Sequence, residues 1–167
     1  MKNLYIDFDG VLLDTIDVTY KILGELNIDT KDYEAVGRFY ETLDWNHILA
    51  ITPEINDGIK FLQEIISKDI FDVSILTHVN SLNETIEKVN FIRKYFDGIT
   101  VIPVPKKISK TKMVNAKDSI LVDDYDKNLK EWEEAGGVGI LFSKSLKDKG
   151  FKVIDRLDQI IDVLSNK

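Results

Sequence analysis

Short runs of branched and aromatic apolar residues alternate with longer segments of helical spacing along this chain of 167 residues. This alternation is typical of a parallel sheet whose crossover helices cover both faces. Five runs are predicted as strands: Leu4–Asp7, Val73–Thr77, Ile99–Ile102, Ile120–Asp123 and Gly139–Phe142. The predicted fold class is therefore α/β, a three-layer, doubly wound parallel sheet with Asp7 on a central strand.

Roughly sixty residues separate the first two predicted strands, which is too many for a single crossover helix. Apolar residues such as Val18 and Ile22 recur at helical spacing in this interval. We therefore predict a small helical cap over residues 15–67, inserted into a core formed by residues 1–14 and 68–167.

Three local patterns predict helix boundaries. Thr52-Pro53-Glu54 resembles an N-cap followed by proline at the first helical position, so a helix returning to the sheet should begin there. Ser81–Glu84 has the pattern of a capping box, and Gly136-Gly137 should end the helix that contains Trp132. In the helix after Ser81, four residues fall on one predicted core-facing stripe: Leu82, Ile86, Val89 and Ile92.

Charge and composition exclude several functions. Lys and Arg total 22 against 29 Asp and Glu, and the net charge of −7 argues against nonspecific binding to a nucleic-acid polymer or an anionic membrane. An anionic substrate then needs a local basic site, and one lysine cluster is available: Lys106, Lys107, Lys110 and Lys112. Without cysteine, and with only His47 and His78, the chain offers no thiolate or His-rich metal site, so any metal should be bound by oxygen.

The N-terminus is apolar only in part. Acidic residues interrupt Met1–Asp9 before it reaches the length of a signal peptide, and no apolar stretch approaches membrane-spanning length. We expect a cytoplasmic protein without a membrane partner. The oligomeric state stays open.

Asp7 and Asp9 follow the first predicted strand, and the carboxyl ends of strands line the ligand crevice of an open parallel sheet. Covalent phosphoryl transfer needs such a pair. One carboxylate attacks phosphorus, while the other protonates the leaving oxygen and later activates water. Gly10 would let the backbone turn closely around a phosphate. The alternative is an ordinary acidic turn after a strand, and the short pattern alone does not decide between the two.

A second carboxylate pair, Asp123 and Asp124, ends the fourth predicted strand. Bringing it together with Asp7 and Asp9 is unfavourable without a counter-ion, and magnesium suits a site of a few carboxylates, waters and phosphate oxygens. The alternative is that the second pair only forms the acidic N-terminus of the following helix, and taken alone that interpretation is favoured.

Thr77, Lys110 and His78 are the candidate substrate contacts. The hydroxyl of Thr77 can receive a phosphate oxygen at the end of its strand. Lys110 can neutralise charge shared by the nucleophile and the phosphate, and we rank it ahead of Lys112, although the cluster itself does not show which lysine points inwards. His78 adjoins Thr77, but a loop histidine without a chemical role is at least as well supported.

In chain order, the aspartate pair, the strand-end Thr, the Lys and the final acidic pair resemble the four motifs of haloacid dehalogenase (HAD) superfamily phosphatases. The resemblance covers nearly the whole chain and implies a Rossmann-type core. It also implies that magnesium binds the nucleophile carboxylate, the backbone carbonyl of the second aspartate and a fourth-motif aspartate. The implied catalytic residues are Asp7, Asp9, Thr77 and Lys110, and the implied metal site is Asp7, Asp9, Asp123 and Asp124.

More narrowly, Ile120–Trp132 followed by Gly136–Phe142 is similar to the 5′(3′)-deoxyribonucleotidase branch. Asn128 would match the Asn of that branch's Asp-Asp-x-x-x-Asn pattern, and a hydrogen bond within the first helical turn is an equal alternative. The predicted cap is short. Its aromatic residues could stack on a nucleobase, but packing within the cap is favoured; they are Phe39, Tyr40 and Trp45.

The resemblance implies a magnesium-dependent hydrolase of small phosphomonoesters that forms an aspartyl phosphate, with deoxyribonucleotides among its candidate substrates. One rival is a phosphoacceptor signalling domain. That class has its acidic pair near the N-terminus and its accepting Asp on a middle strand, whereas here Asp57 lies in a helical pattern. The other rival is a catalytically inactive binding module on the same fold, although Asp7, Asp9 and Asp123 are all present.

Overall fold

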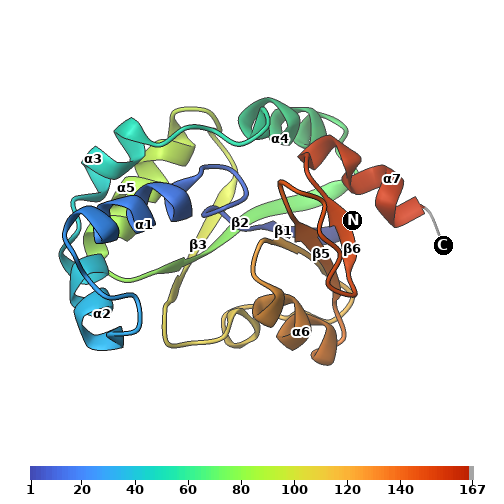
Figure 1. The fold of residues 1–167 in the computed structure, drawn as a ribbon. Coiled ribbons are helices and arrows are strands. Elements are labelled where there is room, and N and C mark those ends of the chain that lie inside the picture. Colours follow the sequence, from blue (N-terminus) through green and yellow to red (C-terminus); the bar gives the residue numbers. More distant parts are fainter. Residues whose placement is uncertain (166–167) are drawn as a thin grey trace.

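A computed structural model describes residues 1–165. Six strands form one sheet in the order β3-β2-β1-β4-β5-β6, and every neighbouring pair is parallel (Figure 1). The strands are β1 (Lys2–Ile6), β2 (Phe71–Val79), β3 (Thr100–Pro105), β4 (Ile120–Asp123), β5 (Val138–Phe142) and β6 (Lys152–Ile154). The predicted α/β class is confirmed, and β1 is central between β2 and β4.

β6 is not among the five strands predicted from the sequence. It has three residues and begins with Lys152, so it is too short and too polar to show a strand pattern. It lies at the edge beyond β5, where one row of hydrogen bonds to its neighbour is enough to fix it. β3 forms the other edge, a position that tolerates Pro103 and Pro105.

Helices connect the strands and cover both faces of the sheet (Figure 1). They are α1 (Thr15–Glu25), α2 (Tyr33–Thr42), α3 (Trp45–Ile51), α4 (Gly58–Ser67), α5 (Leu82–Arg93), α6 (Asp126–Glu134) and α7 (Ile160–Ser165), with single 3₁₀ turns at Lys110–Lys112 and Leu157–Gln159. As predicted, α6 ends at a glycine pair, and Gly136 has a φ of +88°. None of the helices within residues 1–165 has the length and apolarity to cross a membrane.

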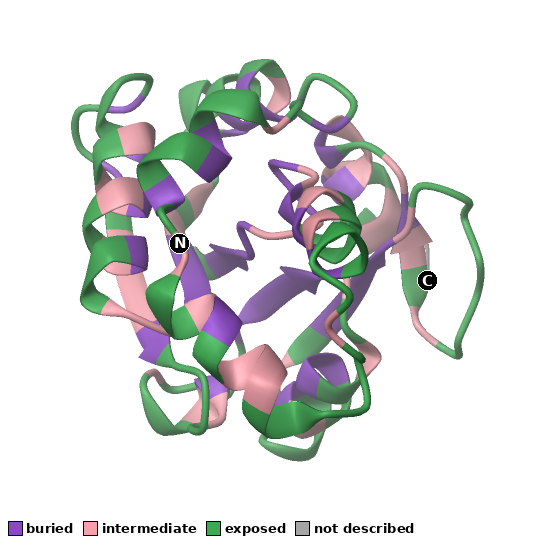
Figure 2. Ribbon diagram, turned by 60° about the vertical axis from the view of Figure 1, so that its left-hand side comes forward, coloured by how far each residue is buried: buried purple, intermediate pink, exposed green. Residues whose placement is uncertain are grey.

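Alternating side chains of β1 divide the core into two layers. Leu4 and Ile6 pack with α4, α5 and α7 on one face, whereas Tyr5 packs with Trp132 of α6 on the other, with their rings 5.3 Å apart. Buried residues concentrate in the central strands, as Figure 2 shows. Burial on both faces explains why the strands are nearly continuous apolar runs.

The prediction that a helix begins at Thr52–Glu54 is wrong. Thr52 caps the C-terminus of α3, and α4 begins only at Gly58. The backbone of the intervening segment pairs with the turn after β1 instead, because Asp14 N–H donates to the Pro53 carbonyl at 3.0 Å. Glu54 still acts as a cap, because its side chain accepts a hydrogen bond from the backbone N–H of Ile59.

The predicted cap at 15–67 contains α1 to α4. The first three of these helices lie beside α5 in Figure 1, and α4 packs against β2 and the Leu157–Gln159 turn. The cap boundaries stay a prediction. Its aromatic side chains pack inwards: Phe39 and Trp45 are buried, and the hydroxyl of Tyr40 lies 3.0 Å from Thr19 Oγ1.

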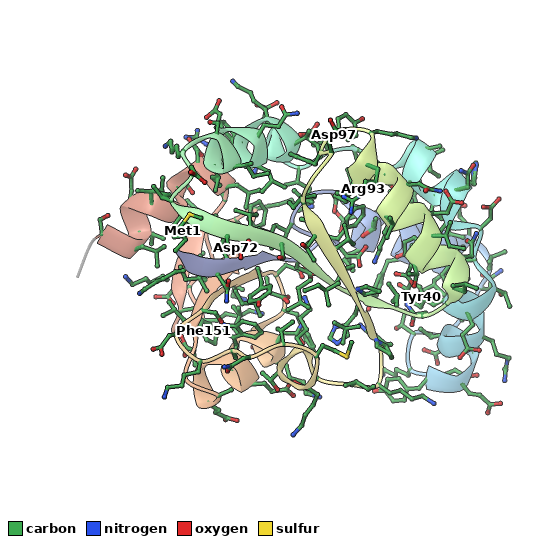
Figure 3. All side chains as sticks on the ribbon, turned by 180° about the vertical axis from the view of Figure 1, so that it is seen from behind. Met1, Tyr40, Asp72, Arg93, Asp97 and Phe151 are labelled. Carbon is green, nitrogen blue, oxygen red and sulfur yellow. The ribbon has the colours of Figure 1, made fainter. Side chains whose placement is uncertain are left out.

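The prediction for the core-facing stripe of α5 is also wrong in part. Leu82 and Ile86 are exposed, and the buried residues of α5 are Glu84, Lys88 and Ile92. Figure 3 shows this helix running between Tyr40 at its N-terminal end and Arg93 at its C-terminal end. Apolar periodicity misidentified the face because two charged side chains, four residues apart, are buried as partners of each other.

Candidate active site

The carboxyl ends of three adjacent strands bring most of the candidate residues together. Asp7 directly follows β1, Asp123 ends β4, and Thr77 lies two residues before the end of the neighbouring β2. The Asp7 N–H donates to the carbonyl of Val122 at 2.9 Å, which fixes the end of β1 against β4. Parallel pairing therefore brings together residues more than a hundred positions apart in the sequence.

The carboxylates of Asp7, Asp123 and Asp124 form an acidic cluster in which one oxygen of each lies within 4.8 Å of the others. Asp7 and Asp123 are buried and Asp124 is half-buried. Lys110 Nζ lies 3.0 Å from Asp7 Oδ1 and 2.7 Å from Asp123 Oδ2. One ammonium against three ionised carboxylates leaves the cluster short of positive charge.

The pKa values of the residues in the cluster reflect this lack of positive charge. Burial, followed by the repulsion from Asp123, raises the pKa of Asp7 to about 7, although Lys110 opposes the shift. Burial, then Asp7 and Asp123, raises the pKa of Asp124 to about 8. Burial alone would lower the pKa of Lys110, but the carboxylates of Asp123 and Asp7 raise it above its ordinary value, so this lysine is charged.

Asp123 is held from several sides. In addition to Lys110, the side-chain amide of Asn128 donates to its Oδ2 at 3.0 Å, and the Tyr125 N–H donates to its Oδ1 at 2.9 Å. Asn128 is buried, and its side chain reaches the site rather than serving only the first turn of α6. A carboxylate fixed in this way presents a defined oxygen pair to a ligand.

Gly10 makes the close approach between the two acidic loops feasible. Its φ of +74° is unfavourable for other residues, and a Cβ at this position would lie 2.1 Å from Asp124 Oδ2. The sequence predicts close approach of this backbone to a phosphate. In the structure, the neighbour that leaves no room for a side chain is the Asp124 carboxylate.

Lys110 is the one member of the lysine cluster at the acidic site. It lies in the 3₁₀ turn Lys110–Lys112, which Ser109 caps by accepting from the Thr111 N–H and anchors by donating to Glu131 of α6. Lys110 is 1% exposed. The other three lysines are exposed: Lys106, Lys107 and Lys112.

The side chain of Asp9 lies outside the acidic cluster. Its Oδ1 accepts from the Thr15 hydroxyl at 2.6 Å, and its Oδ2 accepts from Lys88 Nζ at 2.5 Å. The proposed contribution of Asp9 to a metal site, through its backbone carbonyl, stays a prediction. Its side chain is 18% exposed and is one of the more open groups at this edge.

Thr77 is buried, and its Oγ1 lies 3.1 Å from Lys88 Nζ. His78 Nε2 lies 2.8 Å from the Ile108 carbonyl, which ties β2 to the loop before Lys110. Burial lowers the pKa of His78 below its ordinary value, so a neutral ring that donates to this carbonyl is favoured. Substrate contact by Thr77 and His78 stays a prediction.

Three residues near Asp9 were not among the predicted site residues: Lys88 and Thr15, which donate to its carboxylate, and Glu84, which pairs with Lys88. The i,i+4 spacing of Glu84 and Lys88 on the side of Ile92 was the available signal. That signal is weak, because most charge pairs of this kind lie on solvated helix faces.

Comparison with known proteins defines the fold. No protein-family model and no curated protein matches this sequence. Among solved structures, a HAD phosphatase from Thermococcus onnurineus aligns with a TM-score of 0.62 and 16% identity, over 100% of this chain and 99% of that one. A hydrolase from Pseudomonas syringae aligns at 0.63 and 9% identity, over 99% and 98% of the two chains. A HAD-superfamily hydrolase of subfamily IA from Geobacter sulfurreducens aligns at 0.61 and 15%, over 98% and 99%. At such identities the likeness shows the fold alone, which is the Rossmann-like α/β fold of HAD-superfamily hydrolases.

Proposed function

We propose that this protein is a magnesium-dependent hydrolase of small phosphomonoesters that forms an aspartyl phosphate on Asp7. The observation that carries the proposal is the acidic cluster of Asp7, Asp123 and Asp124 at the carboxyl edge of the sheet, in which Lys110 is the one paired cation among residues 1–165. The likeness to HAD-superfamily hydrolases over entire chains supports the same class of reaction.

The acidic cluster fits magnesium. Its donors are carboxylate oxygens, the ligands that this ion prefers. The raised pKa values of Asp7 and Asp124 mean that the cluster gains by binding a cation in place of protons. Asp7, one or both of Asp123 and Asp124, and the backbone carbonyl of Asp9 would hold the ion. When bound, magnesium would neutralise the charge of the phosphoryl group as the Asp7 carboxylate approaches it.

Each site residue would have its own role in the two steps of the reaction. A carboxylate oxygen of Asp7 attacks phosphorus, and the bond from phosphorus to the ester oxygen breaks as Asp9 gives that oxygen a proton. Asp9 next removes a proton from water, which attacks the phosphorus of the aspartyl phosphate, releases inorganic phosphate and restores Asp7. Lys110, at 3.0 Å from Asp7, would stabilise charge on the transferring group, and the Thr77 hydroxyl would hold a phosphate oxygen.

We further propose nucleoside monophosphates, including deoxyribonucleotides, as a substrate class to test within the phosphomonoesters. The motif around Asp123 and Asn128 suggests it. The three solved structures described above are named as phosphatases or hydrolases and not as nucleotidases. The burial of Phe39 and Trp45 argues against base stacking on those two rings.

The decisive experiment is a phosphate-release assay with magnesium across a panel of phosphomonoesters, including 5′ and 3′ deoxyribonucleotides, sugar phosphates and an aryl phosphate. The proposal expects catalytic turnover that Asp7→Asn abolishes. Stable phosphorylation without turnover would instead support a phosphoacceptor domain. Absence of both, with ligand binding retained, would support an inactive binding module.

A further inference from the structure

α5 buries an ammonium and a carboxylate at the same edge of the sheet. Lys88 and Glu84 are each 1% exposed, and Lys88 Nζ lies 2.7 Å from Glu84 Oε1. A buried ammonium is costly unless every N–H finds an acceptor. The acceptors of the Lys88 ammonium therefore identify the side chains that this buried lysine holds in place.

Lys88 has more acceptors than hydrogens. Besides Glu84, its Nζ lies 2.5 Å from Asp9 Oδ2 and 3.1 Å from both Thr77 Oγ1 and the His78 carbonyl. An ammonium has three N–H donors and no acceptor. Lys88 thus joins the proposed acid/base residue, Asp9, to the proposed phosphate-binding residue, Thr77.

The contact with Thr77 has a direction. Because Lys88 can only donate, Thr77 Oγ1 must be the acceptor, and the hydroxyl proton of Thr77 points elsewhere. Its remaining partner is the His78 carbonyl at 3.3 Å, a long contact that already lies beside the Lys88 ammonium. A phosphate oxygen that enters the site would compete with this long contact for the hydroxyl proton.

Two donors, one on each oxygen, hold the carboxylate of Asp9. Lys88 holds Oδ2, and the Thr15 hydroxyl at the start of α1 holds Oδ1. The carboxylate is thus fixed by one group from the core and one from the helices inserted after β1. Each oxygen retains a second lone pair, so these two hydrogen bonds orient the carboxylate and still leave it able to bind a substrate.

Lys88 is itself anchored. The Oε2 atom of Glu84 accepts from the Asn80 N–H at 2.6 Å and from its side-chain amide at 3.1 Å, which ties the helix to the loop after β2. The ammonium also lies 5.1 Å from the centre of the Trp45 ring of α3 and 5.3 Å from that of Phe8. These contacts hold Lys88 at one place between the cap and the core.

We infer that Lys88, anchored by Glu84, is a positioning residue that aims the carboxylate of Asp9 and the hydroxyl proton of Thr77 at the phosphate ester. The inference rests on the proposed phosphatase function. It deepens that function by assigning a second buried lysine, on the side of the leaving group, to the site of Asp7 and Lys110.

The test compares Lys88→Met with a matched control, Lys94→Met, which alters an exposed lysine at the C-terminal end of the same helix. Steady-state rates are measured with an alkyl phosphate and an aryl phosphate. A misaimed Asp9 affects proton donation most, and an alkoxide leaving group needs that proton more than an aryl oxide does. We expect Lys88→Met to lower kcat about 10²-fold for the alkyl ester and less than about tenfold for the aryl ester, with Lys94→Met unchanged.

A double-mutant cycle separates positioning from a general structural defect. If Lys88 acts through Asp9, adding Lys88→Met to Asp9→Asn should cost much less than the product of the two single losses. Equal losses for both esters, together with multiplicative losses in the cycle, would overturn the inference. Far-UV circular dichroism and melting curves show whether each variant is folded.

Glu84→Gln provides a second variant if Lys88→Met does not fold. It keeps an oxygen acceptor for Lys88 but removes the charge, so a smaller loss with the same preference for aryl over alkyl ester is expected. A uniform loss in this variant would count against the inference. If wild-type protein turns over no ester of the panel, the proposed phosphatase function fails instead, which is a different result from an active wild type with a uniform loss in the variants.

Discussion

Two buried lysines lie at the same edge of the sheet, and the difference between their surroundings defines the site. Lys110 faces three clustered carboxylates, two of which have pKa values raised to about 7 and about 8. Lys88 faces two carboxylates and has an acceptor for every N–H. With every carboxylate ionised, Lys110 faces three negative charges and Lys88 faces two, so the shortage of positive charge is larger in the Lys110 cluster. This larger shortage points to the Lys110 cluster as the place for a cation and a phosphate.

The largest expected effect follows from removing the nucleophile in the Lys110 cluster. Asp7→Asn should lower turnover by at least about 10³-fold, because an amide does not attack phosphorus. It should not unfold the protein, since it removes one of the crowded carboxylates. Phosphate release and a melting curve measure the two effects. Activity near that of the wild type would show that Asp7 is not the nucleophile.

Asp9→Asn tests the residue that the Lys88 cluster holds. We expect a severe loss that is milder for an aryl than for an alkyl phosphate, since a leaving group of low pKa needs less help from an acid. Rates for the two esters over a range of substrate concentration provide the measurement. Equal losses would contradict the assignment of Asp9 as the acid.

A paired substitution tests which lysine serves the phosphate. Lys110→Met should lower kcat about 10²- to 10³-fold with a smaller change in KM, because the lost charge acts chiefly in the transition state. Lys112→Met, at an exposed position in the same 3₁₀ turn, should be nearly silent. The reverse result would mean that Lys112, and not Lys110, is the lysine of the motif. The comparison between the two buried lysines would then be wrong.

The smallest effect is a change of stability with pH and magnesium. Asp7 and Asp124 have folded-state pKa values raised from 3.8 to about 7 and about 8, so the folded state binds protons more tightly than the unfolded state. Metal-free protein should therefore lose stability as the pH rises from about 4 to about 8. Thermal melts at several pH values measure this slope, which Asp7→Asn should flatten.

Magnesium should oppose that loss, because it binds the ionised carboxylates of the folded state. At a magnesium concentration a hundred times Kd, the stabilisation is about 2.7 kcal/mol. Calorimetry near pH 7 should also detect protons released on binding. Calcium is expected to bind without supporting turnover, and a calcium-supported rate equal to that with magnesium would argue against the proposed coordination.

Much of the fold was predictable because each central strand is buried on both faces, so its residues are apolar whatever the tertiary context. The polar site residues lie at or next to the carboxyl ends of β1, β2 and β4, and strand order alone brings Asp7 and Asp123 together. β6 was not predictable from its composition. Three residues with one lysine acquire strand structure only from β5 beside them.

The Lys88 cluster was not predictable for a different reason. A lysine and a glutamate on a helix normally face solvent, and the exposed Leu82 and Ile86 gave the opposite face a more apolar pattern. Acceptors from elsewhere in the chain, Asp9 after β1 and Thr77 in β2, help to make burial of Lys88 favourable. Likewise, pairing between Asp14 and Pro53 overrode the helix-start pattern at Thr52.

The most direct test of the central claim is chemical trapping of the phosphorylated aspartate. Wild type and Asp9→Asn are mixed with magnesium and an aryl phosphate, quenched in acid and reduced with borohydride, which converts an acyl phosphate to the alcohol. Peptide mass spectrometry should then find homoserine at position 7, in greater amount for Asp9→Asn because its hydrolysis step is slowed, and none in Asp7→Asn. Turnover without any reduced residue, or reduction at Asp123 or Asp124 in place of Asp7, would contradict the account.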